Sequence, residues 1–83
     1  MLPSIESILS DIEFRKVHLV VMVTENAAIK LGVSPRQMFD RFMRHGIIEQ
    51  GLVKFYETLH TQSLDYVTDW AIEALQNREA EEL

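Results

Sequence analysis

The sequence predicts an all-α fold, a compact bundle of about four helices in a single domain. Three observations predict it. Apolar residues recur at spacings of three and four along most of the chain, which is the period of a helix with one buried face. Glycine and proline occur singly, at positions that begin or end helices. A chain of 83 residues without cysteine must build its core from its apolar residues, which make up 47% of the total.

The first predicted element is a long helix from Ser10 to about Gly32. Ser10 and Glu13 have the spacing of a capping box, so residues 1–9 are interpreted as an N-terminal extension. The centre of the helix, residues 17–23, is apolar on nearly every side except at His18. We therefore expect the other helices to surround this stretch.

The second predicted helix begins at Pro35, with Ser34 as its N-cap and Gln37 three residues after the cap, and Gly46 stops it. Its period predicts a buried stripe: Met38, Phe39, Phe42 and Met43. The polar residues of the same helix are expected to point outward: Arg36, Gln37, Asp40, Arg41 and Arg44.

A third helix is predicted from about Ile48 to His60, although Gly51 weakens its first turn. Its inward residues follow the helical period: Ile48, Leu52, Phe55, Tyr56 and Leu59.

A fourth helix follows, which Ser63 can cap. Its predicted apolar stripe comprises Val67, Trp70, Ala71, Ala74 and Leu75. Ile72, which we expect to be exposed beside this stripe, would permit a structural homo-oligomer. Residues 79–83 are expected to form a frayed acidic tail.

The charges are unevenly distributed along the chain. The net charge is −5, which on average disfavours a nucleic acid or an anionic membrane as partner. Residues 30–45 nevertheless carry four basic side chains against one acid, a local charge of +3, whereas seven acids against one arginine give −6 from residue 57 onward. The longest apolar run, residues 19–23, is too short to span a membrane, and we expect a cytoplasmic protein.

The residues known to carry chemistry form no recognisable constellation. The three histidines, His18, His45 and His60, lie on different predicted elements and never at the i, i+4 spacing that suits a metal. The chain has no cysteine nucleophile, no activated serine turn and no phosphate-binding glycine loop. We therefore interpret the protein as a non-enzyme without a cofactor.

Asp65, Asp69 and Glu73 form an acidic ladder on the fourth helix, at successive i, i+4 positions. Each like-charge pair destabilises an isolated helix by a few tenths of a kcal/mol, so the ladder suggests a basic counterpart. That counterpart could be Arg36, Arg41 and Arg44 of the same chain, the same residues of a second copy, or a separate partner. Alternatively, the ladder is simply a hydrated face that aids solubility.

The joint between the last two helices, Leu59–Gln62, has two interpretations. In the local one, His60 bonds the last carbonyls of the third helix while Thr61 or Ser63 caps the fourth, which leaves Gln62 without a local role. In the functional one, the joint and two neighbouring tyrosines form a recognition patch for another protein. That patch would comprise Tyr56, His60, Thr61, Gln62 and Tyr66.

A helix-turn-helix is an alternative interpretation of residues 26–46, in which Arg36, Arg41 and Arg44 would contact DNA. Aligned on Gly32, however, the second helix should have an aliphatic residue at position 41 and polar or basic groups at 39 and 40. The chain has Arg41, Phe39 and Asp40 there. An ordinary αα-hairpin explains the same connection.

Residues from about Phe14 to Leu75 resemble a family of small bacterial domains of unknown function, family 3791. The resemblance rests on the Ser-Pro-Arg-Gln-Met-Phe start of the second helix, on Arg-His-Gly-Ile at its end and above all on Leu-His-Thr-Gln at the joint. The family often has glycine where this chain has Ser63. The resemblance implies an all-α fold, no assigned enzymatic activity and no established functional residues.

Members of that family are often encoded beside domains that resemble ADP-ribosyltransferases, which implies an accessory or antitoxin-like role. The first hypothesis is therefore a protein-interaction module that acts on a neighbouring protein through the joint and the acidic ladder. The alternative is a DNA-binding transcriptional regulator that presents the helix from Pro35 to His45 to DNA. In both hypotheses the chain can form a homo-oligomer.

Overall fold

The computed structural model describes the backbone of residues 5–82 and the side chains from residue 13 onward. The all-α prediction is confirmed, because these residues form helices and turns and no strand. In chain order the elements are α1 (Ile5–Leu31), α2 (Pro35–Arg44), the π-helix η1 (Ile48–Val53), α3 (Tyr56–Leu59) and α4 (Leu64–Glu81).

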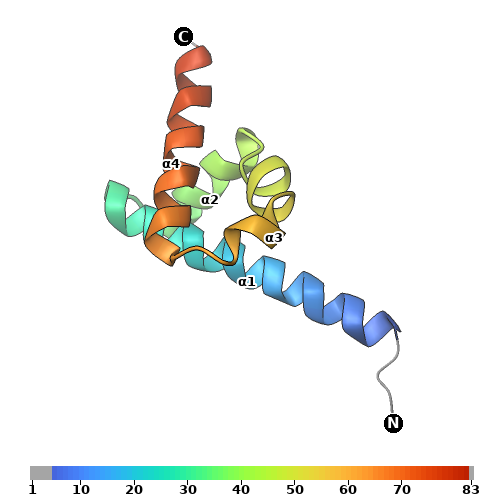
Figure 1. Cartoon of the computed structure of the whole chain (residues 1–83). Coiled ribbons are helices and arrows are strands. Elements are labelled where there is room, and N and C mark those ends of the chain that lie inside the picture. The colour runs from blue at the N-terminus through green and yellow to red at the C-terminus, as the bar shows by residue number, and fades with distance from the viewer. Residues whose placement is uncertain (1–4, 83) are drawn as a thin grey trace.

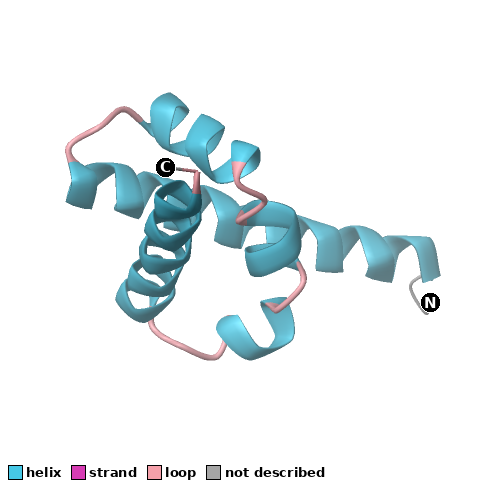
Figure 2. Cartoon of the chain, turned by 90° about the horizontal axis from the view of Figure 1, so that it is seen from above, coloured by secondary structure: helices cyan, strands magenta, loops and turns pink. Residues whose placement is uncertain are grey.

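The long helix α1 supports the other elements, which gather around its C-terminal half (Figure 1). The helix α4 rises steeply from α1, and α2 and the η1–α3 segment lie beside it. Seen from above, the N-terminal part of α1 extends beyond the rest of the molecule (Figure 2). Only part of α1 is therefore packed against other helices.

The helix α1 begins earlier than the sequence predicts. Its backbone is already helical at Ile5, so Ser10 lies inside the helix and residues 5–9 are not an extension. The predicted Ser10–Glu13 capping box requires the side chain of Ser10, which lies outside the described residues. Residues 1–4 lie outside the described backbone as well. No glycine or proline interrupts residues 5–31, and a serine within a helix costs only a few tenths of a kcal/mol. Gly32 (φ 68°) ends the helix as predicted.

The prediction that other helices surround the centre of α1 is wrong. Val20 and Val23 are buried, but Val17 is 59% exposed and Val21 is 45% exposed. The four remaining elements, three of them of ten residues or fewer, do not cover an apolar helix on every side. The core instead lies on one face of α1, and its members are Val20, Val23, Ala27, Ala28, Met38, Phe42, Ile47, Ile48, Leu52, Leu59, Val67, Ala71 and Leu75.

The start of α2 is confirmed. The Gln37 backbone N–H donates to the Ser34 hydroxyl, and the Ser34 N–H donates to the Gln37 side chain, both at 3.1 Å. After the C-cap His45, Gly46 (φ 71°) turns the chain. The predicted cap residues thus fix both ends of the helix.

Half of the predicted buried stripe of α2 is wrong. Met38 and Phe42 are fully buried, whereas Phe39 is 42% exposed and Met43 is 47% exposed. Each exposed residue follows a buried one, so its side chain is rotated by about 100° away from the core. Arg41 is half-buried rather than outward, because it pairs with Glu79 of α4.

The predicted third helix is divided into η1 and α3. The Leu52 N–H donates to the Ile47 carbonyl at 2.9 Å, five residues back, which is the bond of a π-helix. Gly51 lies at this wider turn, and a Cβ built on it would lie 3.1 Å from Cη2 of Trp70. Glycine therefore serves the close approach of η1 and α4. Phe55 is exposed, contrary to the prediction, and Tyr56 is half-buried.

The helix α4 starts where predicted, because the Tyr66 N–H donates to the Ser63 hydroxyl at 3.1 Å. It continues to Glu81, so the predicted frayed tail is incorrect up to that residue. Contacts with α2 hold this end: Arg78 donates to the His45 carbonyl at 2.9 Å. Ile72 is half-buried against the core rather than exposed.

Candidate protein-interaction site

The joint contains both structural contacts and side chains that face solvent. Ser63 caps α4, and the Thr61 hydroxyl donates to the Thr58 carbonyl at 2.8 Å. Thr61 and Ser63 therefore fix the turn. The His60 ring stacks on Tyr56 instead, with centroids 4.9 Å apart and planes 18° from parallel. Its Nε2 lies 3.8 Å from a carboxylate oxygen of Glu57, an ion pair only when the histidine is protonated.

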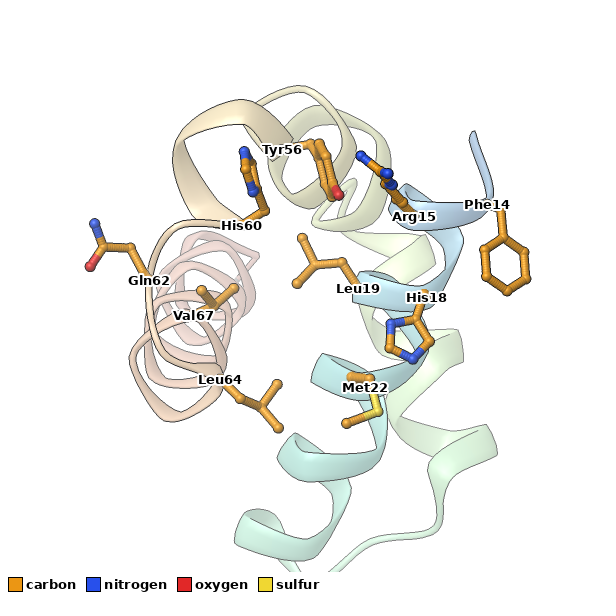
Figure 3. A pocket seen from close by; sticks show the side chains of 10 residues that line it. All are labelled: Phe14, Arg15, His18, Leu19, Met22, Tyr56, His60, Gln62, Leu64 and Val67. Atoms are coloured by element: carbon orange, nitrogen blue, oxygen red, sulfur yellow. The ribbon is translucent and has the colours of Figure 1, made fainter. Parts of the chain in front are cut away.

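A groove lies between α1 and the joint, and we call it the α1–joint groove (Figure 3). Its volume is about 380 Å³. It is lined by Phe14, Arg15, His18, Leu19, Met22, Tyr56, His60, Gln62, Leu64 and Val67. Leu19, Leu64 and Val67 form an apolar floor, and the polar ends of Arg15, His18 and His60 lie around it. Leu19 and Leu64 are partly exposed and Val67 is buried beneath them, so the floor is only partly open to solvent.

A second hollow lies on the other side of the joint, between α3 and α4, and we call it the aromatic groove. Its volume is about 290 Å³, and it is lined by Phe55, Thr58, Leu59, Gln62, Tyr66 and Trp70. Gln62 lines both grooves and so forms the crest between them. The predicted recognition patch is thus split, with Tyr56 and His60 on one side of Gln62 and Tyr66 on the other.

The sequence interpretation missed the half of the α1–joint groove that α1 supplies. His18, Leu19 and Met22 belong to the stretch that we expected to be surrounded, and Arg15 precedes it. One signal could have found them: an 83-residue chain is too small to cover a helix that is apolar on nearly every side. His18, a polar residue within that stretch, marks the uncovered side.

The acidic ladder has an intramolecular counterpart, which is Lys30 of α1 rather than the three arginines. Its Nζ lies 2.8 Å from Asp69 and 3.4 Å from Asp65. The hydrogen bond with Asp69 raises the pKa of Lys30, and an Asn26 hydrogen bond together with Lys30 lowers the pKa of Asp65. Two ladder members thus tie α4 to α1. Glu73 forms no ion pair within the part of the chain that the structure describes.

Arg41 forms a bidentate pair with Glu79, at 2.7 and 2.9 Å, which joins α2 to α4. This pair half-buries Arg41 and leaves Arg36 and Arg44 as the exposed arginines of α2. The angle between α1 and α2 is 111°, within the range of helix-turn-helix units. The alternative DNA-binding face therefore keeps its crossing angle but has one of its three arginines engaged by a carboxylate.

The Arg41–Glu79 pair predicts a pH dependence of stability. The hydrogen bond from Arg41 lowers the pKa of Glu79 below its ordinary value of 4.5. A depressed carboxyl pKa stabilises the fold above the unfolded pKa, and this stabilisation is lost as the pH falls through the folded one. Glu79→Gln should thus cost a few tenths to about 1 kcal/mol at neutral pH, since the pair is partly exposed, and less in acid, once the pH lies below the folded pKa.

Urea denaturation of both proteins at neutral and at acid pH measures this difference. Glu81→Gln is the matched control, because Glu81 is exposed on the same helix and is expected to change stability little at either pH. A cost of Glu79→Gln that stays constant with pH would contradict the assignment of this pair.

Within residues 13–82, no group of three or more histidine or acidic side chains is placed to hold a metal ion. The same part of the chain contains no single helix that is long and apolar enough to cross a membrane; α1 and α2 meet that criterion only together, across their 111° bend.

A comparison of the sequence with protein families finds a known family. Residues 18–78 match a family described as a protein of unknown function, DUF3791. The chain belongs to the DUF3791 family. The match spans most of the chain, from His18 on one side of the α1–joint groove to Arg78 near the end of α4. Phe14 and Arg15 precede the matched part. Neither the curated proteins nor the solved structures contain a match to this DUF3791 protein.

Proposed function

We propose that this DUF3791 protein is a protein-interaction module that binds a segment of a partner protein in the α1–joint groove. It would act by binding rather than by catalysis, in the cytoplasm. The partly open apolar floor of the groove carries this proposal. A groove that partly exposes Leu19 and Leu64, above the buried Val67, favours an apolar side chain as its occupant.

The rim of the groove indicates the chemistry of the partner segment. On a chain of net charge −5, this rim gathers Arg15 and two histidines. The segment that fits presents an apolar side chain with a carboxylate beside it, so that the carboxylate pairs with Arg15. The stacked Tyr56–His60 pair reduces the entropy lost on binding, because the two rings already pack together.

The finer proposal is an accessory or antitoxin-like companion of an enzyme encoded beside it. An ADP-ribosyltransferase-like protein is the partner class that the family resemblance implies. A tagged copy expressed from its own locus, with mass spectrometry of what co-purifies, tests this. One stoichiometric protein would support the interaction module. Duplex DNA without a protein would support the DNA-binding alternative, for which the 111° angle between α1 and α2 is the favourable observation.

With the partner in hand, His60→Ala combined with Gln62→Ala should weaken binding about tenfold or more. The melting temperature should change little, since both side chains are exposed. Titration calorimetry and thermal denaturation measure the two effects. Gln76→Ala, an exposed glutamine elsewhere on α4, serves as the control. Equal losses of binding and stability would make the joint a structural element instead.

A further inference from the structure

One face of α1 is open at residues 14–21 and covered further along the helix, at residues 24–28. Phe14, Val17 and Val21 follow the i, i+3, i+7 spacing and are 70%, 59% and 45% exposed. The same series continues with Thr24 and Ala28, which are buried. We call Phe14, Val17 and Val21 the open stripe. Three successive apolar residues on one exposed helix face are typical of an interaction surface.

A hollow of about 290 Å³ lies directly beyond the open stripe, between α1 and α2. Its lining is mostly apolar and consists of Val20, Val21, Thr24, Glu25, Pro35, Arg36 and Phe39. A closed apolar cavity of about 150 Å³ already holds benzene, so this hollow can receive a phenyl side chain. The Thr24 hydroxyl is buried here without a hydrogen-bond partner in the described part of the chain.

We propose that a second copy of the chain docks on this face, with the two α1 helices antiparallel. In this symmetric arrangement Val17 of each copy faces Val21 of the other, so the numbers of any two facing residues add up to 38. Phe14 of each copy then stands opposite Thr24 of the other, above the hollow. The face thus carries both a protruding phenyl ring and a hollow that can receive it, the self-complementarity that a two-fold axis requires.

The charges beside the stripe fit the same register. Glu13 precedes the protruding Phe14, and Arg36 and Glu25 are the charged residues that line the hollow. Antiparallel packing carries Glu13 to the α2 side of the second copy, where Arg36 lies. Glu13 of each copy therefore meets Arg36 of the other copy, so the charge pair forms twice, once on each side of the two-fold axis. In each pair Arg36 lies between Glu13 of the other copy and Glu25 of its own.

The size of the surface indicates a dimer of modest affinity. The open stripe and Phe39 expose roughly 400 Å² per copy, about half of what each partner contributes to a standard interface. The dissociation constant of the dimer should therefore be on the order of micromolar. Phe14 also lines the outer edge of the α1–joint groove, but Figure 3 shows it pointing away from Tyr56 and His60, so the dimer leaves the floor of that groove uncovered.

Analytical ultracentrifugation over a range of protein concentrations tests this proposal. The wild-type chain should pass from monomer to dimer, and Phe14→Ala should weaken the dimer at least tenfold with an unchanged circular dichroism spectrum. Glu13→Arg and Arg36→Glu should each weaken it, and the two together should restore it, because the pair is then re-formed with its charges exchanged.

Lys54→Glu, a charge reversal away from this face, is the control and should leave the dimer intact. A chain that stays monomeric at all concentrations would overturn the proposal, as would a dimer that the single charge reversals leave intact or that the double replacement fails to restore. Glu13 and Arg36 do not line the α1–joint groove, whereas Phe14 does. The two charge reversals therefore separate failure of the dimer from failure of partner binding.

Discussion

Phe42→Ala is expected to lose most of its folded population at 25 °C, whereas Phe39→Ala stays folded. Phe42 is fully buried, and truncating a buried phenylalanine costs about 3–5 kcal/mol. A single core in a chain of this size supplies only about that much stability. Urea denaturation followed by circular dichroism should therefore show a midpoint near zero denaturant for Phe42→Ala.

Phe39→Ala is the matched control, because it removes the same atoms from the same helix. Phe39 is 42% exposed, so its replacement should cost about 1 kcal/mol or less. The comparison belongs at low protein concentration, where the monomer dominates. Equal destabilisation by the two replacements would mean that both rings are buried in the same core.

This pair of residues shows what the sequence could and could not predict in α2. Ser34, Pro35 and Gly46 determine the ends of the helix through local backbone bonds, which depend only on neighbouring residues. Which phenylalanine is buried depends instead on the position of α1, a distant part of the chain. The helical period of the apolar residues allowed both, because Phe39 and Phe42 lie on overlapping faces.

The candidate site likewise has one part that the sequence indicated and one part that depends on how distant helices pack. The joint stood out in the sequence because His60 and Gln62 are polar residues at a helix connection, and the structure places both on the α1–joint groove. The opposite wall of that groove comes from α1, whose uncovered side depends on how far the other helices extend. Likewise, Lys30 is the counterpart of Asp65 and Asp69 only because α1 and α4 cross near them.

Gly51→Val is expected to destabilise the fold by about 1–3 kcal/mol, as overpacking of a filled interior does. A single Cβ at this position would already lie 3.1 Å from Cη2 of Trp70, and the valine methyl groups would occupy space that the ring fills. Gly51→Ala should cost less, because only Cβ is added and alanine gains about 1 kcal/mol in helix propensity. Fluorescence of Trp70, the single tryptophan, reports unfolding directly.

The contact itself is tested by replacing Trp70 with leucine, which removes the ring that Gly51 accommodates. If the ring is the obstacle, Gly51→Val should cost at least about 1 kcal/mol less in the Trp70→Leu background than in the wild type. Circular dichroism replaces fluorescence as the probe in that background. Additive costs would instead assign the role of Gly51 to the backbone of η1, whose π-helical turn would then need glycine independently of α4. The comparison therefore decides whether η1 departs from an ordinary α-helix because α4 packs against it.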